Sequence, residues 1–102
     1  YVAVNGVRYE TSLIVMPDRP VELWKVSSLE LLDETSVAAL GALGADVLVI
    51  GTGQDLRFPE RSILRSLADA GIGAEIMDTA AACRTLNILV AEERNVLAAV
   101  IV

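Results

Sequence analysis

The first third of the chain alternates short apolar runs with turn-forming residues, a pattern typical of β-strands. Two β-prone runs flank Asn5-Gly6, a pair that tolerates the positive φ angles of a type I′ turn, so residues 1–9 are predicted to form a hairpin. The apolar run 12–16 ends at two prolines, which cannot continue strand pairing. Residues 21–26 alternate between two unlike faces and predict a further strand.

Three later segments predict helices, because helix-starting and helix-ending residues bound apolar positions that recur at helical spacing. Asp33 is placed to cap the first helix, and Pro59 to occupy the first turn of the second, which ends before Gly71. An alanine-rich stretch, residues 79–92, favours the third helix. The Asp78 carboxylate can accept hydrogen bonds from the amides of its first turn.

Three apolar segments predict the main strands of a sheet. Residues 46–50 are nearly all apolar, as expected of a strand covered on both faces, and residues 72–77 follow the second helix as another strand. A strand–helix–strand unit is right-handed in almost all proteins, so these two strands are predicted to be parallel. Residues 96–102 are wholly apolar and must lie inside the sheet, because an exposed apolar edge promotes aggregation.

Composition and charge exclude several classes of function. The 102 residues carry 8 basic and 14 acidic side chains, a net charge of −6, so neither nucleic acid nor an anionic membrane surface is expected as a partner. No histidine is present, which removes the usual zinc ligand and the Ser-His and Cys-His nucleophile pairs. No apolar run is long enough to span a membrane, and a lone cysteine fits a reducing compartment. The composition predicts a single soluble, cytoplasmic domain over residues 1–102, with no metal and no cofactor, and it favours a non-catalytic role.

A glycine turn, Gly51-Thr52-Gly53, directly follows the predicted strand 46–50. Dinucleotide-binding proteins place such a turn against a pyrophosphate, but a third glycine is missing and five residues separate the turn from Pro59. No lysine follows the glycines, so a phosphate-binding P-loop is excluded. The three residues are candidates for ligand binding, and the favoured interpretation is a structural turn in which backbone approaches backbone closely.

Arg57, Arg61 and Arg65 recur every four residues, and the last two project from the face of the second predicted helix that is opposite its apolar stripe. One interpretation is a site for an anion or an acidic partner. The favoured interpretation is a solvated face whose arginines pair with Glu60 and Asp69, because most charge runs on helices are solvated.

The segment 78–87 carries polar and reactive side chains at the start of a helix that follows a parallel strand, where open α/β sheets bind ligands. The candidates for ligand binding in this segment are Asp78, Thr79, Cys83, Arg84 and Asn87. Cys83 lies one helical turn after Thr79, so the two share a face, but a free cysteine in such a helix is more often a small buried hydrophobe than a nucleophile. Arg84 and Asn87 share another side and either bind a polar ligand or are structural. In the structural interpretation, Arg84 is buried and satisfies carbonyls or pairs with Asp78 or Asp55.

Several of these residues, in this order, point to one family. They are Trp24, the run 47–53, Pro59, Gly71-Ile72, Met77-Asp78-Thr79, Ala82-Cys83-Arg84-Thr85 and Asn87. Over nearly the whole chain the sequence resembles the Mth-nine-three-eight-like domain-of-unknown-function family. The segment 78–87 is the specific part of the resemblance.

The resemblance implies an α/β fold: a single three-layer domain with a central mixed sheet, a βαβ crossover and an N-terminal β-hairpin. It implies no established enzymatic reaction. Members of the family include a mitochondrial complex I assembly factor and an adipogenesis-associated protein, alongside uncharacterised bacterial and archaeal proteins. Leu86 departs from the aromatic residue that the family often carries at this position, which argues against a pocket or interface built on that ring.

Three functional hypotheses follow from these residues. The leading one is a non-catalytic interaction domain of assembly-factor type, whose partner is another protein or a second copy of the chain. The alternative is a protein that binds a small molecule or an anion, with or without an unrecognised enzymatic activity, in a pocket between residues 51–54 and 78–87 that Thr52 and Arg84 both line. The third is a redox role for Cys83, which requires a reactive thiol.

Overall fold

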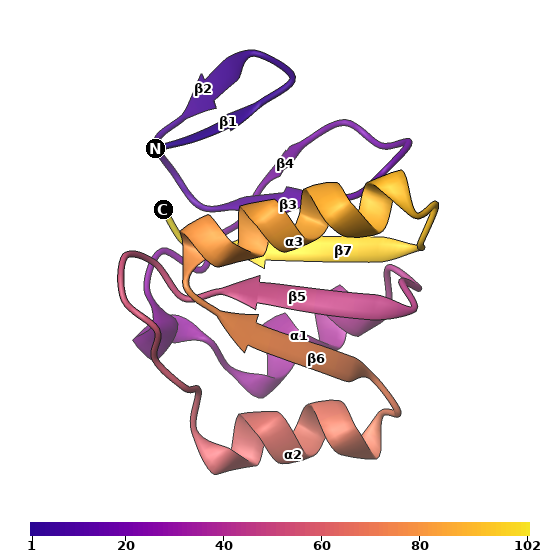
Figure 1. Cartoon of the computed structure of the whole chain (residues 1–102). Helices are drawn as coiled ribbons and strands as arrows, with labels where there is room; N and C mark the ends of the chain where they lie inside the picture. The colour runs from indigo at the N-terminus through magenta and orange to yellow at the C-terminus, as the bar shows by residue number, and fades with distance from the viewer.

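Strands and helices follow one another along the chain much as the apolar pattern predicts, and the computed structural model describes all 102 residues. The strands are β1 Val2–Val4, β2 Val7–Tyr9, β3 Leu13–Val15, β4 Glu22–Leu23, β5 Val47–Gly51, β6 Gly73–Met77 and β7 Val96–Val100. The helices are the 3₁₀ turn η1 Leu29–Leu31 and the α-helices α1 Glu34–Gly41, α2 Arg61–Asp69 and α3 Thr79–Ala91. Figure 1 shows their arrangement around a central sheet.

The central sheet has five strands in the order β4-β3-β7-β5-β6 and mixes both strand orientations. β5 is parallel to β7 and to β6, while β3 is antiparallel to β7 and to β4. β7 lies at the centre, and all five of its residues are buried. The parallel strand–helix–strand unit and the interior position of the last strand are therefore confirmed. β1 and β2 form a separate antiparallel hairpin, also as predicted.

Helices cover both faces of the central sheet, which produces three layers (Figure 1). On one face, α1, α2 and η1 enclose the larger apolar cluster, which includes Leu40, Leu67 and Leu97. On the other face, α3 and the hairpin enclose a smaller cluster, which includes Ala82 and Val2. Alternate residues of β7 enter each cluster, which explains why this strand is apolar throughout. No helix combines the length and the apolar character that crossing a membrane requires.

Two aspartates begin helices at the positions predicted. Asp33 Oδ1 accepts a hydrogen bond from the Ser36 amide at 2.8 Å, and Asp78 Oδ1 accepts one from the Ala81 amide at 2.8 Å. These bonds satisfy amides that the first turn of a helix leaves unpaired. Hydrogen bonds from the amide and hydroxyl of Ser36 also hold the pKa of the Asp33 carboxyl below its ordinary value.

Two element boundaries differ from the sequence-based predictions. The strand predicted over residues 21–26 is reduced to the two residues of β4, because the chain then leaves the sheet and the buried side chains of Trp24 and Val26 join the larger apolar cluster. Pro59 is buried and precedes Glu60, the N-cap of α2, instead of occupying the first turn of that helix.

The arginines that follow β5 do not form the ion pairs expected of them. Arg57 precedes α2 and pairs with Glu30 of η1. Arg61 and Arg65 are exposed on α2 and form no ion pair. Arg65 precedes Asp69 by four residues, the less favourable order for an acid and a base on a helix, so the pair contributes little to hold the two side chains together.

Candidate functional site

The two candidate segments meet where β5 and β6 end. Gly51 of β5 is paired with Met77 of β6, and the Thr52 amide donates a hydrogen bond to the Met77 carbonyl at 2.8 Å. The Thr79 amide donates to the Gly53 carbonyl at 2.9 Å. Segments that are 26 residues apart in sequence are thus joined at one edge of the sheet, as their positions after parallel strands predict.

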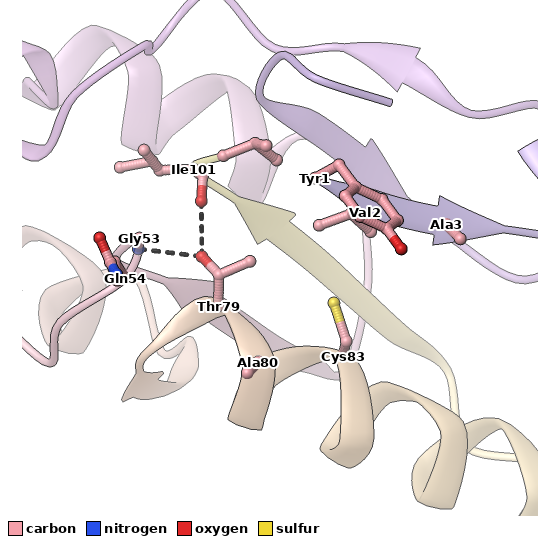
Figure 2. A pocket seen from close by; sticks show the side chains of 10 residues that line it. Tyr1, Val2, Ala3, Gly53, Gln54, Thr79, Ala80, Cys83 and Ile101 are labelled. Carbon is pink, nitrogen blue, oxygen red and sulfur yellow. Dashed lines mark hydrogen bonds between the residues drawn. The ribbon is translucent and has the colours of Figure 1, made fainter. Parts of the chain in front are cut away.

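A cavity of about 600 Å³ lies beside this junction, between the first turns of α3, the start of the hairpin and the end of the chain (Figure 2). Seven of its ten lining residues are apolar. Among the predicted site residues, Gly53, Thr79 and Cys83 line it. Thr52 and Arg84 do not, so the structure does not bring these two to a common wall of this cavity.

The Thr79 hydroxyl ties three segments of the chain together. Its Oγ1 donates a hydrogen bond to the Ile101 carbonyl at 2.6 Å and accepts one from the Gly53 amide at 2.9 Å, both drawn in Figure 2. The residue is buried. Both bonds are made within the chain, so this hydroxyl stabilises the fold at the cavity wall and its proton is engaged by a carbonyl.

The glycine turn also has a structural role, because it lets two backbone segments approach closely. A Cβ on Gly51 would lie 2.9 Å from Thr79 Oγ1 and 3.0 Å from Val100 Cγ1, so only glycine permits α3 to approach β5 this closely. Gly53 has φ +102°, in the region that favours glycine. Thr52 is 6% exposed, and its Oγ1 donates to the Asp55 carbonyl at 2.7 Å. This geometry agrees with the favoured interpretation of a structural turn.

Cys83 lines the cavity on the same side of α3 as Thr79, as the one-turn spacing predicts. Burial raises the pKa of the Cys83 thiol, and the positive charge of Arg84 offsets this only in part. A thiol with a raised pKa carries little thiolate at neutral pH, and the thiolate is the nucleophilic form. The site therefore lacks the feature that activates a cysteine nucleophile.

The remaining candidates do not enter the cavity. The Asp78 side chain caps α3, while Arg84 and Asn87 are exposed on that helix. Arg84 makes no ion pair with Asp78 or Asp55 and no hydrogen bond to a carbonyl, so the interpretation of a buried structural arginine is wrong. The physical reason is its position: Arg84 lies on a side of α3 that faces solvent instead of the sheet.

The residues that close the cavity opposite α3 were not found from the sequence. Tyr1, Val2 and Ala3 come from the hairpin side, and Val102 comes from the end of the chain. Figure 2 shows the Cys83 sulfur directed toward the hairpin. No local pattern marks these residues, because only the tertiary fold brings them to α3. No group of three or more His, Cys, Asp and Glu side chains is placed to hold a metal ion.

The profile of one protein family, described as "Protein of unknown function (DUF498/DUF598)", matches residues 1–101 of the chain. The chain belongs to this family. This DUF498 chain is 32% identical over 100 residues to NADH dehydrogenase (ubiquinone) 1 alpha subcomplex assembly factor 3 of Xenopus tropicalis, a match that covers 96% of this chain and 54% of that protein. The chain therefore spans about half the length of the assembly factor that it resembles.

Solved structures share the fold of this DUF498 chain. An NMR structure of a Xanthomonas campestris protein superimposes with a TM-score of 0.86 at 42% identity, over 96% of this chain and 74% of that one. A Bordetella pertussis protein described as a Mth938-like domain superimposes with a TM-score of 0.79 at 28% identity, over 95% of this chain and 77% of that one. The fold class and the family that the sequence resembles are thereby confirmed.

Proposed function

We propose that this chain is a non-catalytic protein-interaction domain that assists the assembly of a larger protein complex. The similarity to an assembly factor extends over 96% of the chain, so it includes both core clusters and the junction of β5, β6 and α3. Because the chain spans about half of that relative, the proposal concerns the kind of function and names no specific complex.

The observation that carries the proposal is that polar side chains at the strand ends form hydrogen bonds within the chain. Thr52, Asp78 and Thr79 each engage backbone groups of the same chain through their side chains. Burial raises the pKa of Cys83, which leaves its thiol protonated at neutral pH. Thr52, Asp78 and Thr79 are therefore occupied in stabilising the fold, and no side chain at the predicted site is poised as a general base or nucleophile.

The experiment is purification of the tagged full chain from its own cells, followed by native mass spectrometry. We expect the chain in a complex of fixed stoichiometry with another protein or with a second copy of itself. The variant Ala80→Trp, which fills part of the cavity, should retain that complex. A monomeric chain that carries only the added mass of a small molecule would contradict the proposal.

A second candidate function is the binding of a small, largely apolar molecule or anion in the cavity beside α3. Its volume of about 600 Å³ falls in the range of roughly 300–1,000 Å³ that ligand pockets occupy, and its lining is mostly apolar. This function predicts an added mass in native mass spectra that Ala80→Trp abolishes and Arg84→Ala retains, because Arg84 does not line the cavity. An added mass that persists in Ala80→Trp counts against it.

A further inference from the structure

A groove of about 560 Å³ separates η1 and the start of α1 from the loop that joins β5 to α2. Figure 1 shows that loop in pink at the left of the sheet. The apolar part of the groove is formed by Leu29 and Leu32 from the η1 region, Phe58 from the loop and Ile63 from α2. It lies apart from the cavity beside α3, with which it shares no lining residue.

Phe58 is the aromatic side chain of this groove, and it faces solvent. It is the only phenylalanine of the chain, and 67% of its surface is exposed. Two large apolar residues that neighbour groove-lining residues in the sequence are also exposed, Leu56 at 53% and Leu31 at 56%. An exposed aromatic side chain at a concave surface is typical of protein-interaction sites, where such an anchor supplies much of the binding energy.

The loop that carries Phe58 is held in place by its neighbours. Arg57 forms an ion pair with Glu30 of η1, which connects the two walls of the groove. The Arg57 amide donates a hydrogen bond to Thr52 Oγ1 at 3.2 Å, and Pro59 is buried. Phe58 is therefore exposed between two anchored residues, so presenting it to a partner requires little ordering of the loop.

The groove is strongly acidic. Its charged lining residues are four carboxylates and one guanidinium, a net charge of −3: Glu30, Asp33, Glu34, Glu60 and Arg57. Hydrogen bonds hold the pKa values of Glu30, through Arg57, and Asp33, through Ser36, below their ordinary values, so both are ionised at neutral pH. Neither of the two arginines within α2 is among the residues that line the groove.

We infer that this groove docks a segment of a partner protein in which apolar side chains alternate with lysine or arginine. The inference rests on the proposed function and names the surface and the partner chemistry. The apolar residues of the segment pack on Phe58, the exposed apolar side chain of the groove lining, and its cations lie against the carboxylates at the rim. A second copy of this chain, a nucleic acid or an anionic membrane fits poorly, since each brings negative charge to an acidic surface.

The direct test measures the fluorescence anisotropy of labelled synthetic peptides titrated with the full chain at physiological ionic strength. One peptide alternates leucine with lysine, a second replaces lysine with glutamate, and a third replaces leucine with serine. We expect the lysine–leucine peptide to bind and the other two to bind at least about tenfold more weakly, because both the charge and the apolar contacts contribute.

Two variants of the groove and two matched controls locate the binding. Phe58→Ala and the double variant Glu34→Lys/Glu60→Lys should each raise the Kd of the lysine–leucine peptide at least about tenfold. Ile88→Ala and Glu92→Lys, which change an exposed apolar and an exposed acidic residue near the end of α3, should alter it less than about twofold. Circular dichroism checks that all variants fold, as expected for exposed positions.

The inference is overturned if the lysine–leucine peptide does not bind, if all three peptides bind alike, or if the groove variants bind as the controls do. Its failure can be told apart from failure of the proposed function. A protein complex isolated from cells that Phe58→Ala and the charge variant both retain would refute this docking surface and leave the proposed function standing. If the chain is isolated only as a homo-oligomer, this inference fails and the proposed function stands. If it is isolated as a monomer with no protein bound, both fail.

Discussion

The cavity beside α3 and the groove beside η1 differ in what their polar groups do. At the cavity, Thr79 and Asp78 bond to backbone atoms of the same chain and hold the start of α3 against the sheet. At the groove, Asp33 also caps a helix and Glu30 pairs with Arg57, but Phe58 and Glu60 are exposed and have no side-chain partner. Residue types and spacing drew attention to the first region, yet the exposed aromatic side chain lies in the second. Spacing along the chain identifies groups that can react or bind, and the structure shows which of them the fold already uses.

The largest expected effect tests whether Thr79 is structural. Thr79→Val keeps the shape of the side chain but leaves the Ile101 carbonyl and the Gly53 amide without their partner, which should lower the free energy of unfolding by about 2–4 kcal/mol. The matched control is Thr85→Val on the same helix, whose hydroxyl donates only to the Met77 sulfur at 3.3 Å and should cost less than about 1 kcal/mol. Urea denaturation measures both. If both variants lower the free energy of unfolding equally, the two hydrogen bonds of Thr79 have no special structural role.

A second comparison tests the close approach of α3 to β5. Gly51→Ala places a methyl group 3.0 Å from the Thr79 Cα, a backbone atom, and should cost about 1–3 kcal/mol by overpacking. Gly41→Ala is the control, because its new Cβ meets only the flexible end of the Ile72 side chain and the change also favours helix α1. It should be close to neutral in the same denaturation experiment. A larger loss at Gly41 than at Gly51 would contradict the structural interpretation of the glycine turn.

A smaller effect tests the cap of α3. Asp78→Ala removes the acceptor of the Ala81 amide and should lower the free energy of unfolding by about 1 kcal/mol. Asn87→Ala, on the exposed side of the same helix, should change it by less than about 0.5 kcal/mol. If Asp78→Ala leaves the stability unchanged, the carboxylate is not needed to begin the helix and becomes available for binding.

The smallest effect concerns the reactivity of Cys83 and its dependence on pH. Burial raises the pKa of the thiol, so at any pH below that value the folded chain holds less thiolate than the unfolded chain. Alkylation by iodoacetamide should therefore be several-fold slower in the folded protein than in urea at pH 8, and its rate should rise toward higher pH. A folded-state rate at pH 7 equal to or above that in urea would instead support the redox hypothesis.

Much of the fold could be predicted from local sequence patterns. The strands near Val49, Ile76 and Ala98 follow from apolar runs, and the starts of α1 and α3 follow from Asp33 and Asp78, because a strand or a cap depends on neighbours only a few residues away. The meeting of the glycine turn with the start of α3 could also be predicted, since adjacent parallel strands end at one edge of the sheet.

The parts that could not be predicted depend on contacts between distant residues. The alternating pattern of residues 21–26 predicts that Trp24 lies in a strand, but Trp24 follows β4 and its side chain is buried in the larger apolar cluster. Arg57 is expected from the sequence to pair with a nearby acidic residue such as Glu60, whereas its partner Glu30 is 27 residues away. The groove and the cavity are likewise lined by residues that are far apart in the sequence. No short stretch of sequence therefore contains a pattern that predicts either of them.

The most direct test of the account is photo-crosslinking within the native complex. Benzoylphenylalanine replaces either Phe58 in the groove or Ala80 in the cavity, in the tagged full chain expressed in its own cells, and linked proteins are identified by mass spectrometry. The account predicts a protein partner linked from position 58, through a peptide rich in lysine or arginine, and none from position 80. A partner linked from position 80 and not from position 58 would contradict it.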